Sequence, residues 1–379
     1  MLVTFRMAQT QAHWFRRCNW MASAHGRRPS SRNALARALV LAVVITGVHL
    51  RASATQAFGA EDEAQHHNEL LGRGINLGNA LEAPREGAWG VTLKAQYFQD
   101  IKDAGFNSVR IPINWAAHAG TQPPYTIQPM FFSRVDWAIE QALSRDLVAV
   151  INVHHYDEMN RNPDEHLPRL LAIWRQIAQH YRGYADRLYF ELLNEPSNQL
   201  TDERWQAMVP ELLRVVRESN PTRMLIVGPA YWNGLNHLDK LRLPDNDRRL
   251  IATFHYYAPF RFTHQVAGWI PGSDAWKGTA WEGSAPEQEA LARDFDEAAA
   301  WAARNKRPLY VGEFGAYHEA DMASRARWTK SVVEAARKRG FSWAYWEFCS
   351  GFGAYDPLAS KWRAPLLESL MGNRNGGKG

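Results

Sequence analysis

From residue 70 onward, short apolar runs and longer amphipathic stretches alternate eight times along the chain. Apolar runs of three to six residues predict buried strands, and their alternation with helices predicts a parallel sheet with helical crossovers. Eight such units fit a single α/β domain folded as a closed (β/α)8 TIM barrel, with its active site at the C-terminal ends of the strands. An open doubly wound sheet is the alternative, but no Gly-rich phosphate-binding turn follows the first strand. The predicted strands are 74–77, 106–111, 148–153, 188–193, 224–227, 251–255, 309–311 and 341–345, and the predicted helices are 93–104, 131–145, 167–181, 203–219, 287–305 and 325–339, with a weaker candidate at 235–241.

Residues 1–54 differ in composition from the rest of the chain. They hold eight Arg and no acidic residue, and an apolar run at 38–48 precedes small residues at 52–54. This pattern predicts a secretory signal, starting at Met1 or Met21, and hence a secreted protein, extracellular or periplasmic. A retained membrane anchor is the alternative, although the run is shorter than the ~20 residues that a span needs. We expect a polar linker at 55–68, the catalytic barrel at 69–371 and a disordered tail at 372–379.

Charge and cysteine content narrow the class of partner. Eight of the 44 Lys and Arg lie in the leader, which leaves 36 basic residues against 39 acidic ones in the remainder. Such a balance argues against nucleic acid as a partner. Removal of the leader leaves Cys349 alone, so no intrachain disulfide is expected. We expect a monomer without stable membrane association.

Polar and aromatic residues gather where the predicted strands end. Asn194 and Glu195 close the fourth strand, which Pro196 terminates. Because neighbouring strand residues point to opposite faces, both can face one site only at a bulge or a strand end. The other strands end in the same way, with Asn79 and Glu82 after the first, Arg110 in the second, His154 and His155 at the third, Trp232 after the fifth, His255 and Tyr257 at the sixth, Glu313 at the seventh and Trp346 at the eighth.

Two of these residues are carboxylates on strands that face each other across a barrel. Glu195 and Glu313 have the residue type and placement that cleavage of a glycosidic bond requires, since one acid protonates the leaving oxygen and a second attacks or stabilises the anomeric carbon. A non-catalytic polysaccharide-binding barrel would be expected to lack one of them. A barrel enzyme acting on sugar phosphates would need a phosphate cradle, which the glycines at 312–315 and 351–353 match poorly. A metal at His154 and His155 is disfavoured because adjacent strand residues diverge, so we expect no metal.

The tryptophans divide into two groups. Those in predicted helices are expected in the core, whereas those in loops after strands could stack on sugar rings, with about half of them serving as loop anchors. The helix group is Trp137, Trp174, Trp205, Trp301 and Trp328, and the loop group is Trp89, Trp115, Trp232, Trp269, Trp276 and Trp281.

Seven motifs in order give the chain a family resemblance. They are GINLGNALEAPREGAWG (74–90), VRIPINW (109–115), VINVHHY (150–156), FELLNEP (190–196), TFHYYAPF (253–260), YVGEFGAY (310–317) and WAYWEFCSGFG (343–353). Together they resemble glycoside hydrolase family 5, and in particular its thermophilic-type cellulase/mannanase branch. The resemblance covers about residues 69–371.

This resemblance implies a role for each motif residue. Glu195 would be the acid/base and Glu313 the nucleophile of a retaining endo-β-1,4-glycanase that acts on glucan, with mannan as a second substrate and no cofactor. An exo-acting β-glucosidase or β-mannosidase is the alternative. Glu82 would contact sugar hydroxyls, unless it forms a loop salt bridge with Arg85. Of the others, Asn194 would hold the 2-hydroxyl, Arg110 and Tyr257 would bond to Glu313, His255 would lie near Glu195, His154 and His155 would line the pocket floor, Trp346 would face the sugar, and Asn79, Trp232, His264 and Trp269 would complete the substrate site.

Overall fold

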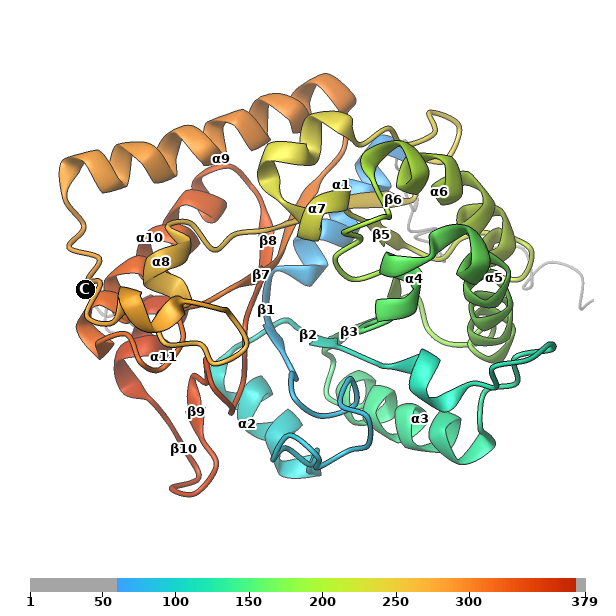
Figure 1. Ribbon diagram of the computed structural model, residues 1–379, viewed down its shortest axis with the longest axis horizontal. Helices are drawn as coiled ribbons and strands as arrows, with labels where there is room; N and C mark the ends of the chain where they lie inside the picture. The colour runs from blue at the N-terminus through green and yellow to red at the C-terminus, as the bar shows by residue number, and fades with distance from the viewer. Residues whose placement is uncertain (1–59, 373–379) are drawn as a thin grey trace, which may run out of the picture. The chain divides into compact units, whose positions relative to one another are not determined.

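Eight parallel strands close into a barrel in sequence order. Figure 1 shows the strands inside a ring of helices. The computed structural model describes residues 60–372. All eight predicted strands are present, and each boundary lies within three residues of its expected position. The barrel fold predicted from the sequence is therefore confirmed. The strands are β1 (Arg73–Asn76), β2 (Ser108–Ile111), β3 (Val148–Asn152), β4 (Leu188–Glu191), β5 (Leu225–Val227), β6 (Leu250–His255), β7 (Leu309–Phe314) and β8 (Ser342–Tyr345).

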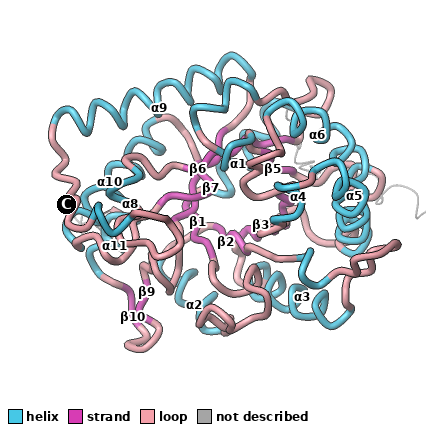
Figure 2. Tube along the Cα trace, viewed as in Figure 1, coloured by secondary structure: helices cyan, strands magenta, loops and turns pink. Residues whose placement is uncertain are grey.

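Helices surround the strands, as the cyan and magenta segments of Figure 2 show. The six long predicted helices all form. The fifth crossover is shorter than the others, as the weak candidate at 235–241 indicated. Only α7 (Ala230–Asn233) and the six-residue 3-10 helix η2 (Leu235–Lys240) connect β5 to β6. One flank of the barrel thus lacks a full covering helix. The long helices are α2 (Ala95–Ala104), α3 (Pro129–Leu143), α5 (Pro163–His180), α6 (Asp202–Arg217), α9 (Ala285–Asn305) and α10 (Met322–Lys338).

Shorter elements decorate the loops between these units. A two-stranded antiparallel sheet, β9 (Tyr355–Asp356) with β10 (Lys361–Trp362), precedes the last helix, α11 (Ala364–Met371). The remaining short helices are η1 (Trp115–His118), α4 (Asp157–Arg161), α8 (Phe260–Thr263) and η3 (Ser273–Trp276).

Residues 60–68, expected to belong to a linker, are instead part of helix α1 (Ala60–Leu71). Ala64, Asn68 and Leu71 are buried and recur at helical spacing, so one face of this otherwise polar helix packs on the barrel. Ala64 and Leu71 share a hydrophobic cluster with barrel-lining residues such as Tyr189 and Ile226. The linker expectation was wrong because these buried residues dock the helix, together with Leu70 on the same cluster and His67, whose Nδ1 lies 2.6 Å from the Tyr189 hydroxyl.

The tryptophans sort largely as their positions indicate. Trp174, Trp205, Trp301 and Trp328 are buried in the main hydrophobic core, and Trp137 is partly buried against it. In the loop group Trp115 and Trp281 are buried, whereas Trp89, Trp232 and Trp269 are exposed by 42%, 51% and 56%. Three loop tryptophans therefore remain free to contact a ligand.

The leader, the first residues of the expected linker and the tail after residue 372 lie outside the described residues. Within 60–372, no helix combines the length and the apolar character that crossing a membrane requires.

Docking of α1 gives a testable stability prediction. Asn68 is buried, accepts a hydrogen bond of 2.6 Å from the Ser342 hydroxyl and donates one of 3.4 Å to the Gly340 carbonyl. We expect Asn68→Ala to lower the free energy of unfolding by about 1–3 kcal/mol, because a buried hydroxyl loses its acceptor. Chemical denaturation measures this change. Gln65→Ala, on the exposed face of the same helix, is the control, and equal stability of the two variants would contradict the docking role.

Candidate active site

A single buried guanidinium lies at the centre of the site. Arg110 on β2 is fully buried and uses all five of its N–H groups as donors. Two go to Glu191 at 2.6 and 2.9 Å, and one goes to Glu313 at 2.7 Å. The last two reach the side-chain oxygens of Asn76 at 2.8 Å and Asn194 at 2.7 Å. Structural pairing with Glu191 and contact with Glu313 thus coexist, and Arg110 connects β1, β2, β4 and β7.

Glu313 emerges from β7 beside an irregularity in the strand pairing. Phe254 pairs with Val311, whereas the next residue of β6, His255, pairs with Glu313, so Gly312 is the extra residue on β7. A Cβ on Gly312 would lie 3.2 Å from Nε2 of His255. Glycine at this position therefore leaves room for the imidazole beside the carboxylate.

The Glu313 carboxylate is held on both oxygens. Arg110 donates to Oε1, and the Tyr257 hydroxyl donates to Oε2 at 2.9 Å. Burial raises the pKa of Glu313, while the nearby His255 and Arg110 oppose that rise. The direct contact with a guanidinium belongs to Glu313 and not to Glu195, so we expect Glu313 to give up its proton first.

Glu195 reaches the site from beyond the end of a strand. β4 ends at Glu191, four residues earlier than Glu195, and Glu195 itself adopts a left-handed backbone with φ of 48°. The expected strand end is thus present, and it lets Asn194 and Glu195 serve one site. Of the Glu195 side chain 29% is exposed, and burial of the remainder raises the pKa of its carboxyl to about 7.

His255 connects the two carboxylates. Its Nδ1 lies 2.8 Å from Oε1 of Glu195 and 3.6 Å from Oε2 of Glu313. Burial lowers the pKa of His255 to about 4, so the ring is neutral near neutral pH. The Asn233 amide lies 3.3 Å from Nε2 and, as oriented, donates to it. That bond places the ring proton on Nδ1, where it donates to Glu195.

The two carboxylates are close neighbours. One oxygen of Glu195, one nitrogen of His255 and one oxygen of Glu313 all lie within 4.8 Å of one another. Such a group could in principle ligate a cation, but both oxygens of Glu313 already accept hydrogen bonds from Arg110 and Tyr257. The arrangement therefore presents Glu195, which holds a proton at mildly acidic pH, beside Glu313, whose charged form accepts hydrogen bonds from Arg110 and Tyr257.

Residues that follow β3 and β8 form one wall of the site. The rings of His154 and Trp346 are parallel to within 7°, with centroids 5.9 Å apart. His155 differs from its expected position on the pocket floor, because it is exposed and contacts the edge of Trp89 at 5.3 Å. Its left-handed backbone, with φ of 52°, turns it toward the rim, so only His154 of the pair lies deep in the site.

Glu82 also differs from expectation. It is 1% exposed, and its carboxylate accepts hydrogen bonds from the backbone amides of Asn79 and Ala80 in its own loop. Burial raises the pKa of Glu82 to about 8, and the nearby Glu347 adds to the rise. No ion pair joins it to Arg85 among residues 60–372. Glu82 thus shapes the loop that carries Asn79, and its carboxyl group faces the backbone of that loop.

Glu347, which the sequence analysis did not select, supports the loop after β8 in the same way, by accepting hydrogen bonds from its backbone amides. It follows Trp346 and is fully buried, and it accepts hydrogen bonds from the amides of Cys349, Ser350 and Phe352 at 2.8–3.1 Å. Burial raises its pKa to about 7. An acid directly after the aromatic residue at a strand end was the available signal. Asn76, the other residue missed, was marked only by its polarity inside a buried strand.

A cleft of about 750 Å³ borders Glu195 on the side away from the wall that His154 and Trp346 form. Trp232 and Trp269, both exposed, line it together with the buried His264. The backbone amide of Trp232 donates to the Pro196 carbonyl at 3.1 Å, which ties its loop to the Glu195 loop. The His264 ring stacks on Phe260 at 4.1 Å. The structure therefore brings these predicted residues to one cleft.

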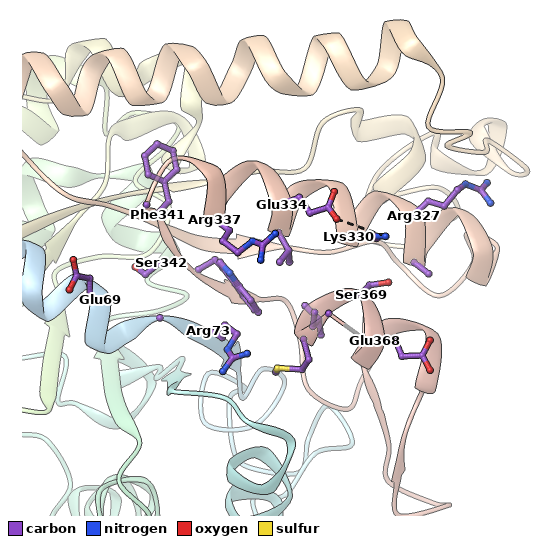
Figure 3. Close-up of a pocket in the computed structure, with 18 of the residues that line it drawn as sticks. Glu69, Arg73, Arg327, Lys330, Glu334, Arg337, Phe341, Ser342, Glu368 and Ser369 are labelled. Carbon is purple, nitrogen blue, oxygen red and sulfur yellow. Dashed lines mark ion pairs between the residues drawn. The ribbon is translucent and has the colours of Figure 1, made fainter. Parts of the chain in front are cut away.

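A larger hollow, of about 890 Å³, lies away from this chemistry. Figure 3 shows it between α10, α11 and the start of β1, with Arg73, Arg337 and Glu368 among its lining. Because it meets the N-terminal ends of β1 and β8, it lies on the barrel face associated with stability and not with chemistry. None of the predicted site residues lines it.

A closed (β/α)8 barrel with two adjacent carboxylates at its C-terminal face has the arrangement that a glycoside hydrolase requires. Comparison with known proteins agrees. The family model for cellulase, glycosyl hydrolase family 5, matches residues 67–351. The chain belongs to this family.

Individual relatives match over most of the chain. Endoglucanase H of Acetivibrio thermocellus is 40% identical over 277 residues, which is 73% of this chain but only 29% of that longer protein. The crystal structure of Cel5A from Thermotoga maritima with cellobiose is 50% identical, with a TM-score of 0.80 over 81% of this chain and 100% of that one. The same relative in complex with mannotriose matches equally well, at 50% identity and a TM-score of 0.80.

The raised pKa of Glu195 predicts the alkaline side of the pH profile. Activity should fall as pH rises through about 7, because Glu195 must carry a proton to act as an acid. We expect Glu195→Gln to remove this alkaline limb for aryl glycosides whose leaving group needs no protonation. Initial rates across pH measure it, with Glu289→Gln on the exposed face of α9 as the control. An alkaline limb that persists in Glu195→Gln would identify another group as the acid.

Proposed function

We propose that the protein is a retaining endo-β-1,4-glycanase that hydrolyses β-1,4-glucan. The observation that carries this proposal is the approach of Glu195 and Glu313 to within 4.8 Å. Retaining enzymes hold their two carboxyl groups ~5–5.5 Å apart, whereas inverting enzymes leave ~6.5–9.5 Å for a water molecule. The short separation favours direct attack by one carboxylate on the anomeric carbon.

In the first step Glu195 gives its proton to the glycosidic oxygen as the bond from that oxygen to the anomeric carbon breaks. Glu313 attacks the same carbon and forms a glycosyl ester. Arg110 and Tyr257 orient the Glu313 carboxylate for this attack and favour its charged form before it.

In the second step Glu195, now a carboxylate, removes a proton from water. The water attacks the anomeric carbon and releases Glu313, so two inversions restore the original configuration. The neutral His255 can donate its Nδ1 proton to Glu195 while that residue is charged. Asn194, held by Arg110 through its side-chain oxygen, leaves its amide nitrogen as a donor for the 2-hydroxyl.

Several features support an endo-acting enzyme of broad specificity. Exposed tryptophans lie on either side of the carboxylates, with Trp89 against His155 and with Trp232 and Trp269 along the cleft beyond Glu195. Sugar rings stack on such faces, so a chain can extend in both directions. The mannotriose complex of the Thermotoga maritima relative supports mannan or glucomannan as a second substrate. An insoluble or polymeric substrate also favours export by the predicted leader.

Chemical rescue tests the two roles. We expect Glu313→Ala to be inactive and azide to restore turnover with an α-glycosyl azide as product, because azide enters from the face that the nucleophile occupied. Glu195→Ala should yield the β-glycosyl azide from substrates with good leaving groups, since its glycosyl ester still forms. NMR of the products distinguishes the anomers, and the same anomer from both variants would refute the assignment.

Substrate breadth is tested with purified polymers. We expect the enzyme to release reducing sugar from both β-1,4-glucan and glucomannan or mannan. Glu82→Ala should lower kcat/KM on both by roughly 10-fold or more, because the loop that carries Asn79 loses its internal acceptor for two amides. The exposed Arg85→Ala in the same loop is the control. Activity on one polymer alone would rule out dual specificity, and wild-type kinetics in Glu82→Ala would show that the Asn79 loop does not depend on this residue.

A further inference from the structure

The cleft beyond Glu195 does not end at the rim of the barrel. Its lining includes Tyr256 and Asp294, of which Asp294 lies on helix α9 outside the ring of strands. A second hollow, of about 280 Å³, shares Tyr256, Ala258 and Asp294 with the cleft and continues along α9 past Pro286. The two hollows thus form one groove that leads from the acid toward the flank of the molecule.

The weak fifth crossover explains why this groove exists. Where a full helix would cover the barrel between β5 and β6, only the four-residue α7 and the six-residue η2 are present. Leu235 and Asn236 of η2 form one wall of the cleft. They also line a hollow of about 250 Å³ between η2 and the second half of α9. The flank of α9 is therefore accessible from the active site.

The side of the site on which the groove lies identifies its occupant. The cleft is lined by Glu195, the residue next to the leaving oxygen, and not by Glu313, which attacks the anomeric carbon. Asn79, His154 and Trp346 on the opposite side are absent from its lining. A chain in this groove is therefore the leaving part of the substrate.

Asp294 is suited to hold a sugar hydroxyl. The Tyr256 hydroxyl donates to its Oδ2 at 2.9 Å, and within residues 60–372 the structure shows no hydrogen bond to its Oδ1. Burial and the adjacent Asp294 raise the pKa of Tyr256, so its hydroxyl remains a donor. The carboxylate is thus fixed by one bond and keeps its second oxygen as an acceptor, while the exposed Ala258 and Pro259 offer apolar surface for a ring face.

We propose that Asp294, with Tyr256 and Ala258, forms a distal leaving-chain subsite that binds a sugar beyond those next to the cleaved bond. The proposal rests on the glycanase activity proposed above and extends it to a preference for long chains. It makes Asp294 a binding residue on a helix flank, in a segment outside the motifs that carry the family resemblance.

Length-defined substrates test the subsite. Cellohexaose, labelled at its reducing end, reports both kcat/KM and the bond that is cleaved, whereas an aryl cellobioside has a leaving group too short to reach α9. We expect Asp294→Ala to lower kcat/KM for cellohexaose by roughly 10-fold, the scale of one lost hydrogen bond to a charged group. Cleavage should shift toward shorter leaving fragments. Kinetics on the aryl cellobioside should stay at the wild-type level.

Two further variants separate binding from folding. Asp294→Asn keeps an oxygen for the Tyr256 hydroxyl and should give a smaller loss on cellohexaose. Ala258→Leu, at an exposed position, should narrow the groove and shift the cleavage pattern in the same direction as Asp294→Ala. Asp296→Ala is the matched control, because Asp296 lies on the same helix but faces Arg339, which donates to it at 2.6 Å.

Each outcome decides between the proposals. Loss on cellohexaose without loss on the aryl cellobioside supports the subsite. An unchanged cleavage pattern in Asp294→Ala, or an equal loss on both substrates, overturns it and leaves the glycanase activity intact. A wild-type protein that cleaves neither substrate overturns the proposed function itself, and the subsite with it.

Discussion

The buried charge of Arg110 is the constraint on which the rest of the site depends. A guanidinium removed from water is costly unless every donor is satisfied and its charge is balanced. Here five acceptor atoms from three other strands and the loop after β4 supply that balance, and three of them are oxygens of the Glu191 and Glu313 carboxylates. The same contacts that make Arg110 tolerable inside the barrel also aim Glu313 and Asn194. Stability and catalytic geometry are therefore properties of one network, and Glu195, which has no such contact, is the carboxyl left to hold a proton.

The two walls of the site are built on different principles. On the Trp346 side, Glu82 and Glu347 each accept hydrogen bonds from backbone amides of their own loop. The packing is close there, because a Cβ on Gly78 would lie within 3.3 Å of Trp346 and Glu347. Close packing and buried carboxylates fix this wall. On the Glu195 side, exposed aromatic faces line a cleft whose flank is thinly covered. The first arrangement suits recognition of one sugar in one orientation, and the second suits contact with chains of varied length.

The sequence predicted the barrel, and it located the polar residues that meet at the strand ends, because both follow from local pattern. Buried parallel strands read as apolar runs, and polar residues at their ends have no structural reason to recur eight times. Side-chain direction outside the strands is another matter. The sequence indicated which loops carry His155 and Glu82, but not where their side chains point. A left-handed backbone turns His155 toward the rim of the site, and Glu82 accepts a hydrogen bond from a backbone amide of its own loop. Helix α1 was missed because its contacts with the barrel combine apolar residues with polar ones such as His67, whose Nδ1 lies 2.6 Å from the Tyr189 hydroxyl. Such features depend on partners distant in sequence, which a periodic pattern does not encode.

Helix α1 also changes where the catalytic unit begins. The family motifs start at residue 74, yet the base of the barrel is covered by a segment that precedes the first strand. Trimming to the motif boundary would uncover Tyr189 and Ile226, and it would deprive Ser342 of the Asn68 side chain. Fusion junctions, affinity tags and minimal expressed fragments should accordingly be placed before Ala60. The smallest fragment of such a chain that can be moved into another protein is therefore set by the helix that covers the N-terminal end of the barrel and not by the residues of the active site.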